Sequence, residues 1–157
     1  MAEIFTIVCE NVSVTAVQDI LAAYAASTKK LQLLAVELSA NGQTAVGNYP
    51  IRLRNLPATV TSGSGGASVT PKNTNPDGAA ASFTARRNDT TQAVTGGSAI
   101  DFVASQFNPI NGYYWTPPPG VGPGDEPKID LSGAFSLSLD NVTGTLNISA
   151  TVWLREV

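Results

Sequence analysis

Strict alternation of apolar and polar residues near the C-terminus constrains the fold more than any other feature. Between residues 129 and 139 the odd positions are almost all apolar, and between 146 and 154 the even positions are. A period of two is typical of β-strands with one buried face. The short turn at residues 141–144 predicts that these strands form an antiparallel hairpin. A hairpin with an apolar face needs a second sheet to cover it, so the sequence predicts a mainly β antiparallel sandwich or jelly roll.

Other segments have the composition of strands and extend this prediction to the whole chain of 157 residues, which we expect to form one domain. The first apolar run is β-branched without clean alternation, so we expect it to be covered on both faces. The second run ends at Asn41-Gly42, a strong turn signal. The expected strands are residues 3–9, 31–38, 49–54 (ending before Pro57), 83–86 and 100–104.

One segment departs from this pattern and predicts a short N-terminal α-helix over residues 15–26. Its apolar side chains recur at steps of three and four residues, as on one face of an amphipathic helix. Thr15 and Gln18 add a capping-box pattern at the expected helix start. The apolar positions are Val14, Val17, Leu21 and Tyr24.

Two stretches have the composition of long loops, at residues 59–78 and 108–127. The first is rich in Gly and Ser and ends in Asn-Pro-Asp-Gly, and the second combines three successive aromatics with several prolines. Loops of this length in a compact domain carry function or stay disordered. The Asn and Asp residues at positions 73, 75 and 77 imitate half of a calcium loop, but position 84 holds Thr where that loop needs Glu. We therefore interpret them as turns.

The composition disfavours most kinds of chemistry. A net charge of −3 gives nothing to attract a phosphate backbone, so we expect no nucleic-acid partner. No stretch approaches the ~20 apolar residues of a membrane span, so we expect no membrane partner. The chain has no histidine, which removes the commonest general base and the usual zinc ligand. Cys9 lies in an apolar strand and is predicted to be a buried thiol. We expect no enzyme activity, no cofactor and no metal site.

The low share of charged residues, 13%, is typical of surfaces that a partner will cover. Two arginine pairs are either solvated or anchor carboxylates of a neighbouring subunit. Successive aromatics in a strand alternate between faces, so at least one of the three aromatics should point outward. They either plug the sandwich, form a contact cluster beside stiff prolines, or stack on sugars. The candidate contact residues are Arg52, Arg54, Arg86, Arg87, Tyr113, Tyr114, Trp115, Pro117, Pro118 and Pro119.

Turn and loop motifs along most of the chain resemble short proteins of tailed-phage genomes and prophages. They are similar in layout to the jelly-roll decoration, or cement, proteins that bind outside an icosahedral head. The motifs are Arg-Leu-Arg-Asn-Leu-Pro-Ala-Thr at 52–59, Thr-Ser-Gly-Ser-Gly-Gly at 61–66, Asn-Pro-Asp-Gly with three alanines at 75–81, Arg-Asn-Asp-Thr-Thr at 87–91 and Asn-Gly-Tyr-Tyr-Trp-Thr-Pro-Pro-Pro at 111–119.

This resemblance implies a structural protein that stabilises the shell by bridging subunits of the phage major capsid protein. It implies a homo-oligomer, dimer or trimer, made in the host cytoplasm and located on the outer capsid surface of the virion. The N-terminal segment and the two long loops are expected to supply contacts. Two other functions stay open: a tail or neck component of the virion, and a carbohydrate-binding or adhesin-like β-sandwich module.

Overall fold

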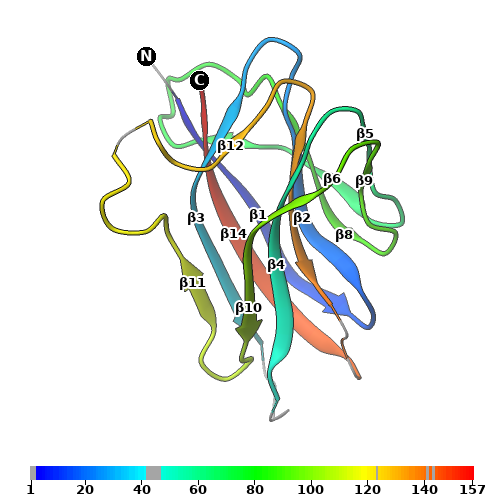
Figure 1. The fold of residues 1–157 in the computed structure, drawn as a ribbon. Coiled ribbons are helices and arrows are strands. Elements are labelled where there is room, and N and C mark those ends of the chain that lie inside the picture. Colours follow the sequence, from blue (N-terminus) through cyan, green and yellow to red (C-terminus); the bar gives the residue numbers. More distant parts are fainter. Residues whose placement is uncertain (1–2, 42–46, 123, 141, 143) are drawn as a thin grey trace.

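Two six-stranded antiparallel sheets pack face to face in the computed structural model (Figure 1), which describes residues 3–41, 47–122, 124–140, 142 and 144–157. Sheet A contains β1 (Ile4–Val14), β3 (Leu31–Ala40), β7 (Lys72–Asn73), β11 (Tyr113–Trp115), β12 (Lys128–Ile129) and β14 (Leu146–Glu156). Sheet B contains β2 (Gln18–Tyr24), β4 (Tyr49–Leu56), β6 (Ala67–Val69), β8 (Thr84–Asp89), β10 (Ile100–Phe107) and β13 (Ala134–Leu139). A small third sheet pairs β5 (Val60–Thr61) with β9 (Val94–Thr95). The predicted antiparallel β-sandwich is confirmed.

The strand order interleaves distant parts of the chain. Sheet A runs β11-β3-β14-β1-β7, with β12 also paired to β3, and sheet B runs β10-β4-β13-β2-β8-β6. The first and last long strands, β1 and β14, are neighbours. All pairings within these sheets are antiparallel. Nearly all of the stabilising contacts therefore join residues far apart in sequence.

The core lies between the two sheets. Phe5 of β1 meets Phe83, just before β8, edge to face with ring centroids 5.5 Å apart. Each large apolar side chain buried there contributes about 1.5–3 kcal/mol. Cys9 is among the buried residues, as predicted, and burial raises the pKa of its thiol to about 11. The largest fully buried side chains are Phe5, Ile7, Ile20, Leu21, Leu31, Leu33, Leu38, Ile51, Leu53, Leu56, Phe107 and Phe135.

The predicted helix over residues 15–26 is wrong, because β2 occupies this segment. Residues 18–23 are all buried, since sheet A covers one face of β2 while β5, β9 and their flanking residues cover the other. A strand buried on both faces has apolar residues without a period of two. The helical spacing of the apolar residues in this segment therefore arises by chance. The Thr15 N–H does donate to Oε1 of Gln18 at 3.4 Å, as in a capping box, but the bond closes a turn.

The predicted C-terminal hairpin is also wrong, although both strands exist. β13 pairs with β2 and β4 in sheet B, whereas β14 pairs with β1 and β3 in sheet A. The two strands therefore lie in opposite sheets, and part of the expected turn (141 and 143) lies outside the described residues, as does Gly42 of the other turn signal. Alternation identifies a buried face but not the neighbouring strand. β13 is buried at every position, including Ser136 and Ser138.

Two further expectations need correction. β1 is covered on one face only, because Phe5, Ile7 and Cys9 are buried while Val8 is exposed. The segment 59–78 is not a long loop, since it contains β5, β6 and β7. Its Gly-rich part packs closely: a Cβ at Gly66 would lie 2.0 Å from the carbonyl oxygen of Arg87. The Asn/Asp residues at 73–77 form the predicted turns, with backbone N–H groups donating to Asn side-chain oxygens.

A buried carboxylate at the end of β14 ties three segments together. Oε2 of Glu156 lies 2.6 Å from Nζ of Lys29, and its Oε1 accepts hydrogen bonds from the N–H and hydroxyl groups of Ser82 at 2.6 and 2.7 Å. Burial opposes ionisation of Glu156, but the hydrogen bonds from Lys29 and Ser82 outweigh it and hold the pKa below its ordinary value.

Glu156→Gln should lower the free energy of unfolding at neutral pH by about 1–3 kcal/mol, because charge-assisted hydrogen bonds are lost. A carboxyl group whose pKa is lowered by folding stabilises the fold above its unfolded pKa of about 4.3, and this stabilisation is lost as the pH falls through the folded pKa. In urea unfolding, the difference in the free energy of unfolding between wild type and variant should therefore shrink below about pH 4. A gap that stays constant to low pH, or an equal effect of the exposed Glu10→Gln, would contradict this assignment.

A matched pair of substitutions tests the strand at 18–24 against the helix expected there. Leu21→Ala should cost about 2–5 kcal/mol, because Leu21 is fully buried, whereas Val17→Ala should change stability by less than about 0.5 kcal/mol, because Val17 is 43% exposed. An amphipathic helix would bury both side chains. Equal losses in chemical unfolding would overturn the strand assignment.

Candidate interaction surface

The predicted arginine anchors are engaged within the chain. Nη2 of Arg54 on β4 lies 3.1 Å from Oδ1 of Asp19 on β2, and the side chain of Asp19 is only 1% exposed. Asp19 also accepts hydrogen bonds from the Ser136 hydroxyl at 2.6 Å and from the Ala93 N–H at 2.8 Å. Burial raises the pKa of Asp19, and these donors and Arg54 oppose that rise. Arg54 therefore compensates an internal charge on the outer side of sheet B.

Arg86 is held in the same way. Its Nε and Nη2 donate to both carboxylate oxygens of Asp89 at 2.8–3.1 Å, and Oδ1 of Asp89 also accepts from the Gly66 N–H. The side chain of Asp89 is 1% exposed. The bidentate geometry expected toward a partner carboxylate is thus satisfied inside the chain, where it fixes β8 against the Gly-rich segment.

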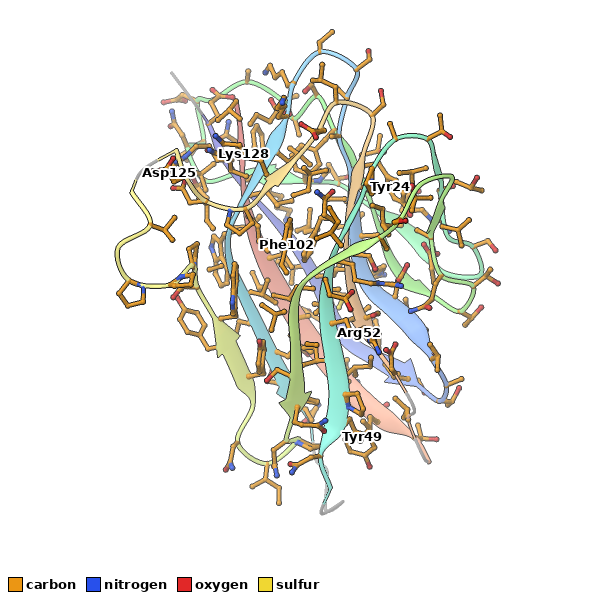
Figure 2. The ribbon with its side chains drawn as sticks, in the orientation of Figure 1. Tyr24, Tyr49, Arg52, Phe102, Asp125 and Lys128 are labelled. Carbon is orange, nitrogen blue, oxygen red and sulfur yellow. The ribbon has the colours of Figure 1, made fainter. Side chains whose placement is uncertain are left out.

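The other two arginines are more accessible. Arg52 projects from β4 (Figure 2) and forms ion pairs with Asp101 at 2.8 Å and Asp140 at 2.5 Å, although its side chain is 45% exposed. Arg87 is half-buried at the edge of the sandwich. Arg87 and Glu10 line a small groove of about 270 Å³. The four arginines lie on sheet B and form no common surface patch.

The aromatic trio divides between the core and the solvent. β11 pairs with β3, so Tyr113 and Trp115 pack against the core while Tyr114 points outward and is 66% exposed. Burial raises the pKa of Tyr113, and a hydrogen bond with the Ser105 side chain opposes the rise. The expectation that at least one aromatic faces outward is confirmed, and that residue is Tyr114.

The proline run leads away from β11 without extending it. Pro117 is half-buried, Pro118 and Pro119 are exposed, and the Pro118 carbonyl accepts a hydrogen bond from the N–H of Val121, so the run enters a turn. The loop then returns over one end of sheet A. There the Gly124 carbonyl accepts a hydrogen bond from Gln32, and residue 126 is anchored by Arg155: Nη1 of Arg155 lies 3.2 Å from Oε1 of Glu126.

Beyond that loop, the outer side of sheet A is uncovered. We call this surface the open face. Register places Tyr114, Glu37 and Thr151 in one row across β11, β3 and β14, with Val8 of β1 next in line. Most side chains of the open face are uncharged, and two cations, Lys72 and Arg87, border it beside Val8 and Glu10. Its residues are Val8 and Glu10 on β1, Glu37 and Ser39 on β3, Tyr114 on β11, and Ser149, Thr151 and Trp153 on β14.

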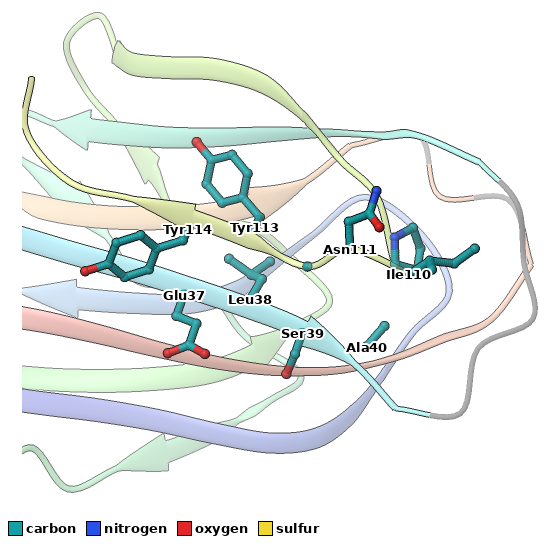
Figure 3. A pocket seen from close by; sticks show the side chains of 10 residues that line it. Glu37, Leu38, Ser39, Ala40, Ile110, Asn111, Tyr113 and Tyr114 are labelled. Carbon is teal, nitrogen blue, oxygen red and sulfur yellow. The ribbon is translucent and has the colours of Figure 1, made fainter.

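Two shallow grooves run over the open face and share Glu37 and Ser39. One, of about 550 Å³, lies between β3 and the turn before β11 and is bordered by Tyr114, Asn111 and Ile110 (Figure 3). The other, of about 390 Å³, continues across β14 to β1. Figure 3 shows Tyr114 and Glu37 beside each other on neighbouring strands. Hydrogen-bond donors and acceptors and one aromatic ring therefore border a continuous surface.

Within the described residues, no group of three or more Cys, Asp or Glu side chains is placed to hold a metal ion. No helix long and apolar enough to cross a membrane occurs in the described part of the chain. The sequence had not singled out Val8, Glu37 or Thr151. The polar half of the alternation at 147–155 indicated an exposed strand face, but only the register shows which residues share it.

The arginines can be separated by stability measurements. Arg54→Ala and Arg86→Ala should each lower the free energy of unfolding by about 3–5 kcal/mol, because a buried carboxylate loses its partner. Arg52→Ala should cost no more than about 1 kcal/mol, because both of its ion pairs are partly exposed. If Arg52→Ala destabilises the chain as much as the other two, the distinction between buried and exposed pairs is wrong.

Comparison of the chain with protein-family models, with curated protein sequences and with solved structures found no match. The described part of the molecule presents one broad uncovered sheet face, and the four arginines of sheet B are already paired or scattered.

Proposed function

We propose that this chain is a structural protein that decorates the outer surface of a tailed-phage head and stabilises the shell by bridging major capsid subunits. The single observation that carries the proposal is the open face. It is a broad sheet surface with two carboxylates, two cations at one border and one exposed aromatic, Tyr114. Covering such a surface costs little desolvation of charge, and an exposed tyrosine is a typical contact centre.

The strand order supports a jelly roll, the finer form of the sandwich. Among the eight principal strands, β1 pairs with β14, β2 with β13, β3 with β11 and β4 with β10. These pairs are nested, like one long hairpin folded over on itself. Double-sheet jelly rolls of eight strands recur in viral capsid proteins and in lectins. The architecture is thus compatible with decoration, and equally with the sugar-binding alternative.

In this mechanism the protein stabilises the shell by binding to it and by bridging its subunits. A copy that binds across two capsid subunits adds contacts that must break before the shell opens. Binding to the assembled shell but not to dissociated subunits stabilises the assembled state by linkage. The part of the open face around Tyr114, where Glu37 is the charged residue of the larger groove, fits a partner surface that presents basic or uncharged groups. A tail or neck position would use the same face on a different partner.

One observation favours a second candidate function, carbohydrate binding. Tyr114 and Glu37 lie opposite each other in register and border the larger groove together with Asn111. An exposed ring flanked by a carboxylate and an amide can stack on a pyranose and bind its hydroxyl groups. A glycan array separates the two functions: specific glycan hits abolished by Tyr114→Ala would favour this candidate over decoration.

Co-sedimentation with phage heads that lack the protein tests the primary proposal. Wild type should bind, and Tyr114→Ala should weaken binding by about 30-fold, the equivalent of about 2 kcal/mol for an aromatic contact centre. The matched control is Val94→Ala, which removes a residue 58% exposed on β9, away from the open face. Failure of wild type to sediment, or equal effects of the two variants, would overturn the proposal.

A further inference from the structure

The outermost strand of sheet B, β10, is an unprotected edge. It pairs with β4 on one side only and runs for eight residues. The other outermost strands, β6, β7, β11 and β12, are two or three residues long. Short edge strands, charges, prolines and bulges are the usual devices that prevent a sheet from pairing with another chain. On β10 the one charge and the bulge lie at residues 101–103, so the rest of the strand is a template for one more strand.

The residues of β10 are suited to pairing. Positions 102–107 carry no charge and no proline, and Ala104, Ser105 and Gln106 are exposed. The one charge on the strand, Asp101, is neutralised by Arg52 at 2.8 Å. A bulge at residues 101–103 interrupts the first part of the strand and leaves Val103 to Phe107 in regular register with β4. Phe102, at the bulge, is half-buried against the core (Figure 2).

The hydrogen bonds of β4 show which backbone N–H and C=O groups of β10 do not bond to β4. Pro50 of β4 has no N–H, and its carbonyl accepts a hydrogen bond from Asp140, on the β13 side. In an antiparallel sheet successive residues bond to alternate sides, so Pro50 does not bond to Gln106, its partner in β10. Gln106 and Ala104 therefore direct their N–H and C=O groups away from β4, toward the open edge.

We propose that β10 pairs with β10 of a second copy of this chain, antiparallel and with Ser105 opposite Ser105 on the twofold axis. In this register Ala104 and Gln106 of each copy exchange hydrogen bonds, which gives four backbone bonds between the copies. Val103 then lies opposite Phe107 in register, twice, and the Phe107 side chain stays buried in the core of its own copy. The bulge at residues 101–103 stays outside the paired segment.

The charge distribution selects a second copy as the occupant. Two copies of a chain with a net charge of −3 repel each other least when they meet through a strip that is free of charge. Residues 102–107 meet that condition, and the carboxylate of Asp101 is compensated within each copy. Small side chains at Ala104 and Ser105 allow the strands to reach normal sheet spacing.

The dimer has a consequence for the proposed function. This consequence rests on the proposed function, whereas the pairing of β10 does not. The twofold axis of an antiparallel strand pair is perpendicular to the sheet, so the two B sheets become one and both open faces lie on the same side. Two equivalent binding faces with fixed spacing match a repeating surface, and the second contact forms at high effective concentration. A dimer that forms without binding to heads would refute decoration and leave the pairing intact.

Disulfide trapping tests the register directly. Ser105→Cys should form a disulfide-linked dimer under mild oxidation, because a directly opposed, non-hydrogen-bonded pair has Cα atoms about 4.5 Å apart. Ala104→Cys is the matched control, since its counterpart is displaced by two residues, about 6.8 Å along the strand. The native Cys9 is buried with a raised pKa and will not compete. No cross-link at 105, or a cross-link at 104 alone, would overturn the proposal.

Sedimentation of the free protein provides the second measurement. Wild type and Gln106→Ala should sediment as dimers, whereas Gln106→Pro should be monomeric, because proline removes an outward N–H without breaking a bond to β4. Circular dichroism checks that Gln106→Pro is folded, and if it is not, the cysteine variants decide. A wild type that stays monomeric across the concentration range would refute the dimer.

Discussion

Face-to-face packing of two antiparallel sheets is the interaction on which the rest of the structure depends. Sheet A supplies Phe5, Ile7 and Leu38, and sheet B supplies Leu21 and Phe135, all fully buried. No disulfide contributes, because the chain has one cysteine. Every strand of the core pairs with a strand distant in the chain, so the contacts that hold the sheets together are non-local. This rigid core positions the open face and the free edge of β10.

The covering of sheet B has a consequence for function. Segments around β5 and β9 bury Asp19 and Asp89, and each carboxylate then requires an arginine. Arg54 and Arg86 therefore stabilise the fold by pairing with these buried carboxylates. The outer side of sheet A lacks such a cover beyond the proline-rich loop, and its polar side chains remain available. The two sides of the sandwich thus differ: one is closed by the chain itself and the other is open to a partner.

The sequence predicts the β-sandwich and most strands because a half-buried strand leaves a period of two, as in residues 146–154 and 49–53. It does not predict β2, because burial of both faces erases that period and leaves Val14, Leu21 and Tyr24 at helical spacing by chance. Alternation also cannot show that β13 and β14 lie in different sheets. Alternation alone shows that at least one of the three aromatics points outward, but only the structure shows that it is Tyr114. The partners of Arg54 and Arg86 depend on packing that no local pattern encodes.

Cryo-electron microscopy of phage heads bearing the protein tests the central claim most directly, because it shows which side of the sandwich meets the shell. Our account predicts density for the sandwich with sheet A toward the capsid, the Tyr114 side chain in the contact and β5 and β9 facing outward. Density with sheet B against the shell, or heads that carry no such density, would contradict it.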